Sequence, residues 1–220
     1  QIGVIFMKYH KLVENAKKPN GFWGKMMIKA MNKGHSSLTS WGLEHMNIER
    51  TATVLDIGCG GGKTVDRLCS IVANGKVYGI DYSELSVKSS EKLNSKNILC
   101  NKAKILQASV SDMPFDDNTF DNITAVETYY FWPDKENDVK EVFRVLKQGG
   151  TVMLLFEMLR TDDDPFKWEK VENMLNIKSV TPQEIRSVLE SAGFENINTY
   201  TKEGTTWLCA TAQKPKDDEN

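Results

Sequence analysis

A glycine-rich segment, Asp56-Ile-Gly-Cys-Gly-Gly-Gly62-Lys-Thr64, follows a short run of β-branched and aliphatic residues. Glycine adopts backbone conformations that side chains exclude, and it lets a ligand approach the main chain closely. A turn of this kind between a strand and a helix is where α/β proteins bind nucleotides. The segment is therefore the first candidate for chemistry.

Neither of the common phosphate-binding motifs fits this turn. A P-loop that ends in the Gly-Lys-Thr at 62–64 requires a glycine at position 57, where the chain has Ile57. A dinucleotide fingerprint that starts at Gly58 requires its third glycine at position 63, which is Lys63. What remains is an acidic residue, Asp56, followed by a G-x-G-x-G spacing.

This spacing resembles that of the class I S-adenosylmethionine-dependent methyltransferases, from about Thr51 to the end of the chain. The resemblance implies that the glycine backbone lies against the methionine portion of S-adenosylmethionine, with Asp56 positioning the loop and the cofactor's amino group. It also implies that Asp81, after the second strand, binds both ribose hydroxyls, because a carboxylate accepts two hydrogen bonds from a diol. Tyr82 would lie against the adenine.

Further segments match the family's pattern in the same order along the chain. Residues 108–115 resemble the adenine-binding segment, although the family's usual acidic residue aligns with Ser109, and Asp112 is either its substitute or a turn residue. Glu127 ends the fourth strand, near the methionine moiety and the acceptor. The resemblance assigns cofactor binding to Asp56, Gly58, Cys59, Gly60, Asp81, Tyr82, Ser109, Val110, Ser111 and Glu127.

To transfer a methyl group, the enzyme mainly has to align the acceptor with the methyl group and exclude water. A dedicated catalytic base is not required. The sequence therefore leaves the catalytic residue unknown. The aromatic run from Tyr129 to Trp132 either walls an acceptor pocket or packs under the following helix, and His35 is either a base or a surface or capping residue. The candidate substrate-pocket residues are His35, Tyr129, Tyr130 and Trp132.

Three consecutive carboxylates, Asp162 to Asp164, are similar to the clusters that hold Mg²⁺ in some catechol-type methyltransferases. Because Pro165 follows them, we interpret them instead as the start of a helix and expect no metal site. The chain also lacks an N/D-P-P-Y run after the fourth strand, which disfavours methylation of DNA bases.

From Thr51 onward, β-rich runs alternate with helical periodicity, which predicts a parallel sheet covered by helices. The expected strands are residues 53–57, 77–80, 104–108, 122–126 and 151–156. A helix with its buried face at Val139, Val142, Phe143 and Leu146 is expected to open at Pro133 and to end in a left-handed cap at Gly149.

Near the C-terminus, Thr181 and Glu184 predict a capping box, and Gly193 ends the helix that follows. Runs at 197–201 and 206–212 predict a hairpin that adds an antiparallel edge strand. The expected fold is α/β: a Rossmann-like, mostly parallel sheet flanked by helices, with an antiparallel C-terminal strand and an N-terminal helical cap.

The expected domains are a helical cap at 1–50, the methyltransferase domain at 51–213 and a disordered tail at 214–220. In the cap, an apolar stripe at helical spacing is either ordinary core or a lid over the site. The stripe consists of Phe22, Trp23, Met26, Met27, Ala30 and Met31, and Leu38, Trp41 and His45 indicate a second helix.

The overall charge argues against large polyanionic partners. The 220 residues carry 28 Lys and Arg against 30 Asp and Glu, a formal charge of −2. We therefore expect no nucleic acid or membrane partner, only a small-molecule acceptor, in a monomer or homodimer. The four cysteines form no C-x-x-C pair and no apolar run could span a membrane, so a reducing, cytoplasmic location is expected.

The sequence thus favours a methyltransferase that uses S-adenosylmethionine and acts on a small molecule. Two alternatives stay open at this level. One is a catalytically inactive protein of the same fold that binds the cofactor or a partner. The other is a nucleotide-dependent kinase or NAD enzyme with an unusual glycine loop.

Overall fold

The computed structural model describes residues 35–216. In chain order the elements are α3 (Ser36–Leu43), β1 (Thr53–Ile57), α4 (Lys63–Ile71), β2 (Lys76–Asp81), α5 (Glu84–Leu93), α6 (Ser95–Leu99), β3 (Ala103–Gln107), β4 (Phe120–Val126), the short 3-10 helix η1 (Tyr129–Phe131), α7 (Lys135–Val145), β5 (Leu146–Phe156), α8 (Glu169–Leu175), α9 (Pro182–Ser191), β6 (Glu195–Thr201) and β7 (Leu208–Gln213). The apolar stripe from Phe22 to Met31 lies outside these residues.

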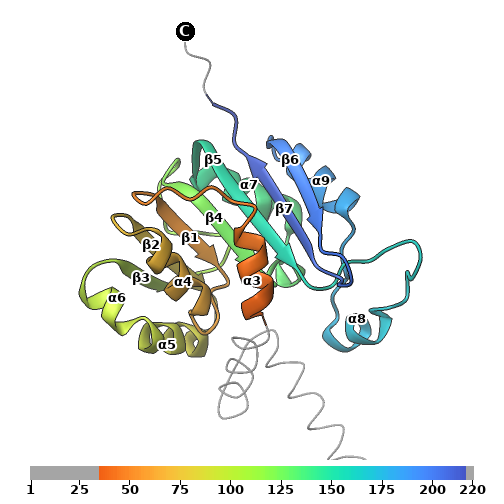
Figure 1. Ribbon diagram of the computed structural model, residues 1–220, viewed down its shortest axis with the longest axis horizontal. Coiled ribbons are helices and arrows are strands. Elements are labelled where there is room, and N and C mark those ends of the chain that lie inside the picture. Colours follow the sequence, from red (N-terminus) through yellow and green to blue (C-terminus); the bar gives the residue numbers. More distant parts are fainter. Residues whose placement is uncertain (1–34, 217–220) are drawn as a thin grey trace, which may run out of the picture.

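The strands form one seven-stranded sheet in the order β3-β2-β1-β4-β5-β7-β6 (Figure 1). The pairs from β3 to β5 are parallel, whereas β7 runs antiparallel to both of its neighbours. The α/β fold, with its mostly parallel sheet and antiparallel C-terminal strand, is therefore confirmed. The antiparallel strand β7 is not the edge strand, however, because β6 pairs with its outer side and forms the edge of the sheet.

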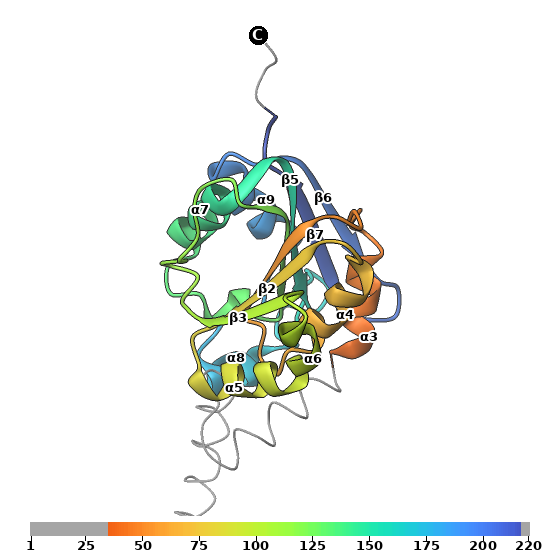
Figure 2. The same cartoon turned by 90° about the vertical axis from the view of Figure 1, so that its left-hand side faces the viewer.

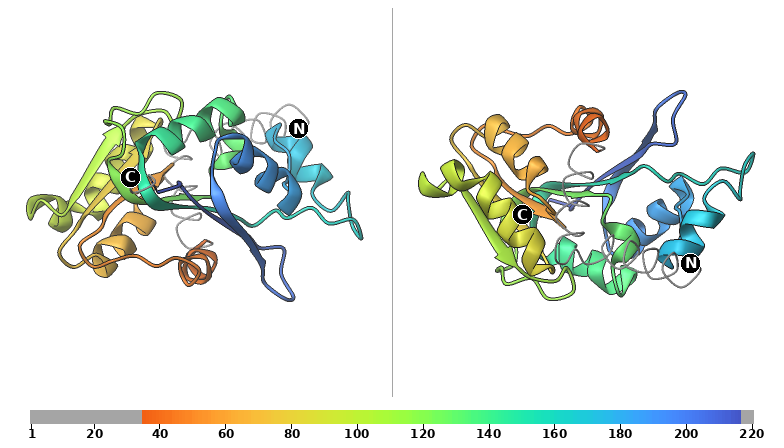
Figure 3. Two further views of the ribbon diagram at one scale, coloured as in Figure 1. Left: turned by 90° about the horizontal axis from the view of Figure 1, so that it is seen from above. Right: turned by 90° about the horizontal axis from the view of Figure 1, so that it is seen from below.

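Helices cover both faces of the sheet, as Figure 2 shows with α7 on one side and α3 and α4 on the other. Side chains alternate between the two faces along each strand. In β1, Leu55 packs in the core cluster that contains Val139 of α7, whereas Val54 packs in the cluster that contains Leu68 of α4. The view from above in Figure 3 shows the sheet lying between these two layers.

The helix before β5 differs from its predicted limits at both ends. It begins after Asp134, whose side chain accepts a hydrogen bond from the Asn137 N–H, so Pro133 precedes the cap. It ends at Val145, because Leu146 already pairs with Phe120 of β4. Gly149 does have a positive φ of 72°, but it lies within β5 and does not cap a helix.

The predicted helix start at Asp164 is also wrong. Within 35–216, helix α8 begins at Glu169, and Asp164 instead forms an isolated bridge with Thr161 in an exposed turn. The capping box of α9 is confirmed, since Thr181 and Glu184 each accept a hydrogen bond from the other's backbone N–H. None of the helices among the described residues is long and apolar enough to cross a membrane.

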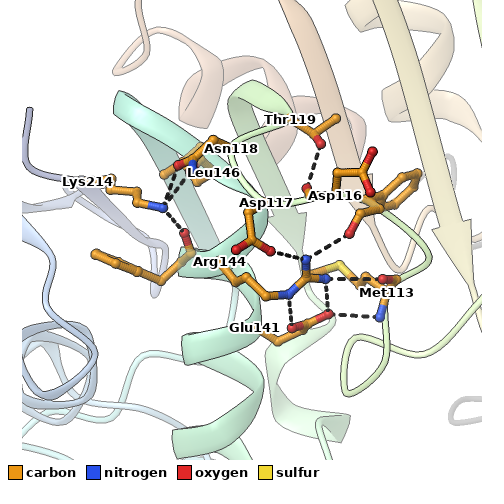
Figure 4. Close-up of polar contacts among 11 residues, drawn as sticks. Met113, Asp116, Asp117, Asn118, Thr119, Glu141, Arg144, Leu146 and Lys214 are labelled. Atoms are coloured by element: carbon orange, nitrogen blue, oxygen red, sulfur yellow. Dashed lines mark hydrogen bonds and ion pairs between the residues drawn. The ribbon is translucent and has the colours of Figure 1, made fainter. Parts of the chain in front are cut away.

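The region before β1 contributes α3, whose Leu38 is buried against Met153 and Leu155 of β5 and Cys209 of β7. At the other end of the domain, the side chain of Lys214 is buried, although the sequence places this residue in the tail. Its Nζ donates to Asn118 Oδ1 at 2.8 Å, to the Phe143 carbonyl at 2.8 Å and to the Leu146 carbonyl at 2.9 Å (Figure 4).

We predict that Lys214→Met lowers the free energy of unfolding by about 2–3 kcal/mol, because it leaves the carbonyls at the end of α7 without a charged donor. Urea titration of the full chain measures the change. Lys104→Met, at an exposed position on β3, is the matched control and should stay within about 0.5 kcal/mol of the wild type. Equal effects of the two substitutions would contradict the prediction.

Candidate functional site

The site lies where the strand order reverses. Strand β1 pairs with β2 on one side and with β4 on the other, and the connections from β1 and β4 pass to opposite faces of the sheet. Open α/β sheets bind ligands at the carboxyl ends of the strands at such a point. The glycine loop follows β1 and Glu127 follows β4, so both lie at this position.

The glycine loop requires its glycines for two separate reasons. Gly58, Gly60 and Gly62 have φ values of 69°, 51° and 81°, a region that favours glycine. A Cβ on Gly58 would also lie 2.2 Å from the Thr128 hydroxyl oxygen, so only a hydrogen fits there. The loop after β1 therefore lies directly against the residue that follows Glu127.

Helix α5 fixes the far end of the loop. The Asn94 side-chain amide donates to the Gly62 carbonyl at 3.0 Å, and a Cβ on Gly62 would lie 2.3 Å from the Ser90 hydroxyl oxygen. Cys59 is buried, and its backbone N–H donates to the Ile80 carbonyl at 2.9 Å. The loop is thus held by β2 and α5 together.

Asp56 connects the two strands that separate at the site. The residue is 2% exposed, and its Oδ1 accepts a hydrogen bond of 2.7 Å from the Thr124 hydroxyl on β4. Burial raises the pKa of this carboxyl to about 7, although the Thr124 bond opposes the shift. Sequence reasoning placed Asp56 at the cofactor's amino group, and the structure shows its carboxyl bonded to β4.

Asp81 joins the end of β2 to the glycine loop. Its Oδ2 accepts from the Gly60 N–H at 2.9 Å and its Oδ1 from the Ser83 N–H at 2.8 Å. Burial raises the pKa of this carboxyl, and the two backbone hydrogen bonds partly offset the effect. The next residue, Tyr82, is 41% exposed, so a flat aromatic surface lies beside a carboxylate that can accept from a diol.

The segment after β3 forms a tight turn. The Ser109 hydroxyl oxygen accepts from the Ser111 N–H at 3.2 Å, and the Ser109 carbonyl accepts from the Asp112 N–H at 3.3 Å. Val110 is buried inside this turn. Asp112 is exposed and completes the turn, which is the second of the two roles that the sequence left open for it.

Arg144 of α7 holds the continuation of this segment, and sequence reasoning missed it. Its guanidinium donates to the Met113 and Phe115 carbonyls at 3.3 and 2.8 Å and binds Glu141 and Asp117, each at 2.7 Å (Figure 4). Glu141 in turn accepts from the Met113 N–H at 3.0 Å. The i, i+3 spacing of Glu141 and Arg144 was the available signal, but it indicated only a surface pair.

At the end of β4, Glu127 has a φ of 58° and turns its carboxyl toward Tyr130 and Glu157. Its Oε1 accepts from the Tyr130 hydroxyl at 3.4 Å and from the Glu157 N–H. The His35 Nε2 lies 3.8 Å from the Glu157 Oε2. One side-chain N or O atom from each of His35, Glu127 and Glu157 lies within 4.8 Å of the other two, so we call these three residues the His-Glu-Glu cluster.

Burial shifts the pKa values of two of the cluster's groups in opposite directions. It raises the pKa of Glu127 to about 8, an effect that the Glu157 N–H opposes and the Glu157 carboxylate adds to. It lowers the pKa of His35, although the nearby Glu157 carboxylate partly restores it. The imidazole and the Glu127 carboxyl are therefore both favoured in their neutral forms.

The structure brings His35, Tyr130 and Glu127 close together and adds Glu157. The sequence assigned His35 and Tyr130 to the substrate pocket and Glu127 to cofactor binding, and these roles stay predictions. Tyr129 and Trp132 are only 5% and 6% exposed, and their ring centroids lie 5.2 Å apart in the core cluster beneath η1. This position corresponds to packing under the following helix. Their assignment to an acceptor pocket stays a prediction.

The known proteins that the chain resembles are methyltransferases. A family model described as "Methyltransferase domain" matches residues 55–154. The chain is 27% identical over 183 residues to the methyltransferase YdaC of Bacillus subtilis, covering 82% of this chain and 93% of YdaC. It is 30% identical over 181 residues to the ubiquinone/menaquinone biosynthesis C-methyltransferase UbiE of Cronobacter sakazakii, covering 71% of this chain and 72% of UbiE.

Solved structures show the same fold. Human N-acetylserotonin methyltransferase in complex with SAM superposes with a TM-score of 0.69 at 18% identity, covering 86% of this chain and 55% of that one. The chain covers only 28% to 51% of the curated sterol 24-C- and demethylmenaquinone methyltransferases that it also matches.

The raised pKa of Glu127 predicts how stability depends on pH. The unfolded glutamate loses its proton near 4.5, whereas the folded residue keeps it until about 8, so the folded state binds more protons in between. Stability therefore falls as pH rises across that interval. Glutamine does not titrate, so we expect Glu127→Gln to remove this pH dependence. When the pH is raised from about 5 to about 8.5, the free energy of unfolding of the variant should increase by more than about 1 kcal/mol relative to that of the wild type.

Urea titrations of the ligand-free protein at the two pH values measure this difference. Glu203→Gln, at an exposed position in the β6–β7 connection, serves as the control and should follow the wild type at both pH values. The same pH dependence in Glu127→Gln and wild type would show that the Glu127 carboxyl titrates normally.

Proposed function

The chain belongs to the class I S-adenosylmethionine-dependent methyltransferase family, and from this premise we propose that it methylates a small-molecule acceptor. It is an enzyme whose cofactor is S-adenosylmethionine, which supplies an electrophilic methyl group on a sulfonium. The observation that carries the assignment to this site is the bond from the Gly60 N–H to Asp81, which joins the glycine loop to the carboxylate that we propose binds the ribose.

The residues at the carboxyl ends of the strands fit this cofactor. Asp81 is buried beside the positive-φ glycines, and Tyr82 offers an exposed ring next to it. In the proposed arrangement, Asp81 holds the ribose hydroxyls, Tyr82 lies against the adenine, and the turn from Ser109 to Ser111 reads the adenine edge. Arg144 acts as a positioning residue, since it fixes the chain that follows this turn.

Two observations support a small-molecule acceptor. The formal charge of −2 provides no excess of basic residues for a nucleic acid backbone. The names of relatives, which include quinone and sterol C-methyltransferases, describe acceptors of small size. A cytoplasmic enzyme acting as a monomer or homodimer completes the proposal.

Methyl transfer from isotopically labelled S-adenosylmethionine to a metabolite extract tests the proposal directly. We expect label to appear in low-molecular-weight products and S-adenosylhomocysteine to form in equal amount. Reduced naphthoquinones belong in a parallel panel because of the quinone-methylating relatives. Label found only in protein or nucleic acid would contradict the small-molecule assignment.

We predict that Asp81→Ala weakens S-adenosylmethionine binding about a hundredfold, because a buried, charge-assisted contact to the ribose is lost. Titration calorimetry measures the dissociation constant, and Asp81→Asn, which retains the side chain's shape, should show a smaller loss in the same direction. Asp163→Ala, at an exposed position, is the matched control and should bind normally. Tighter binding of ATP or NAD by the wild type would overturn the assignment.

A further inference from the structure

The His-Glu-Glu cluster lies next to the glycine loop. Two of its residues, His35 and Glu157, have no part in holding the cofactor in the arrangement above, and the family resemblance placed Glu127 near both the methionine moiety and the acceptor. Glu127 is followed by Thr128, whose hydroxyl approaches the position of a Cβ on Gly58 to 2.2 Å. The cluster is therefore adjacent to the loop that holds the methionine portion, on the side of β4 and β5. In the arrangement proposed above, this is the end of the cofactor that carries the methyl group.

The cluster combines residues that come from distant parts of the chain. His35 precedes α3, Glu127 follows β4 and Glu157 follows β5, and their nearest donor or acceptor atoms lie within 4.8 Å. The charged and titratable neighbours are Tyr130 of η1, which bonds Glu127, and Arg67 of α4, which donates to the Ser36 carbonyl at 2.9 Å beside His35. Among the ion pairs of the described residues, Glu157 pairs only with His35.

We propose that His35 is the base that takes the proton of the methyl acceptor, with Glu157 as its positioning residue and Glu127 as a hydrogen-bonding partner of the same acceptor atom. This inference rests on the proposed function and narrows the acceptor class. The acceptor carries an ionisable O–H or N–H, because a base at this position has a use only where a proton must leave.

The cluster suits these separate roles. A neutral imidazole whose Nε2 lies 3.8 Å from the Glu157 carboxylate can receive a proton at its other ring nitrogen, Nδ1, and the carboxylate stabilises the imidazolium that results. A carboxyl kept neutral by burial, as at Glu127, can donate a hydrogen bond that an ionised one cannot.

A lone pair on the acceptor's O or N forms the bond to the methyl carbon, and the carbon–sulfur bond breaks with its electron pair passing to sulfur. The sulfonium becomes the neutral thioether of S-adenosylhomocysteine. The proton of the acceptor passes to His35 Nδ1, and the imidazolium then releases a proton from Nε2 to solvent by way of the half-exposed Glu157.

Histidine NMR on the full chain with saturating S-adenosylhomocysteine tests the pairing without any acceptor. We expect the pKa of His35 to fall by about half a unit or more in Glu157→Gln, because the imidazolium loses its carboxylate. His45, which stacks on Tyr200 at a centroid distance of 4.0 Å, is an internal reference in the same spectra and should not shift. An unchanged His35 pKa would overturn the role of Glu157.

Turnover is measured as total label transferred from S-adenosylmethionine to the metabolite extract. We expect His35→Gln to lower the rate about a hundredfold while cofactor binding stays within about threefold. The matched control His45→Gln should keep the wild-type rate. In Glu157→Gln the acid limb of the pH–rate profile should move to lower pH, since the rate depends on neutral His35 and its pKa has fallen.

The outcomes separate this inference from the proposed function. Absence of transfer by the wild type would defeat the proposed function, and the inference with it. Normal transfer by His35→Gln would defeat the inference alone. Stoichiometric Mn²⁺ binding to the wild type that Glu157→Gln abolishes would assign the cluster to a cation and overturn the proton-accepting role.

Discussion

The close approach of Gly58 to Thr128 is the constraint on which the rest of the site depends. Only a hydrogen fits between the loop after β1 and the residue after Glu127, so the two strand ends meet without an intervening side chain. The glycine loop can then bend back to Asp81 on one side, while Glu127 turns toward Glu157 on the other. Because Gly58 has no side chain, the glycine loop and the His-Glu-Glu cluster lie next to each other.

Buried carboxyl groups lie on both sides of the contact between Gly58 and Thr128. Asp56 connects β1 to β4 through Thr124, and Asp81 connects β2 to the glycine loop. Taking such groups out of water is unfavourable, so each is compensated by hydrogen bonds from backbone or hydroxyl donors. These polar contacts stabilise the glycine loop less than apolar packing would. They leave polar atoms where, in the proposed arrangement, a ribose or an acceptor binds.

The sequence was sufficient for the order of the elements, because the alternation of apolar runs and the turn residues are local signals. It was also sufficient for Asp81 and the glycine loop, which are close in space because consecutive parallel strands end at one edge. Sequence reasoning was wrong where contacts between residues far apart in the chain determine the limits of an element or the position of a side chain. Leu146 starts a strand early because Phe120 pairs with it, and Lys214 folds back onto the carbonyls of α7. Glu157 lies beside Glu127 only because β5 ends beside β4.

The outermost strand, β6, has a further consequence for how the molecule behaves among its own copies. Its pairing with β7 shifts register between Glu195 and Asn198, and Asn196 there has a φ of 49°. The Asn198 side-chain amide donates to the Asn196 carbonyl at 2.9 Å, so a side chain and not a regular strand partner bonds the main chain at this irregularity. A free sheet edge is a template for aggregation unless it is interrupted. The irregular start of β6 therefore protects this edge against strand-by-strand polymerisation.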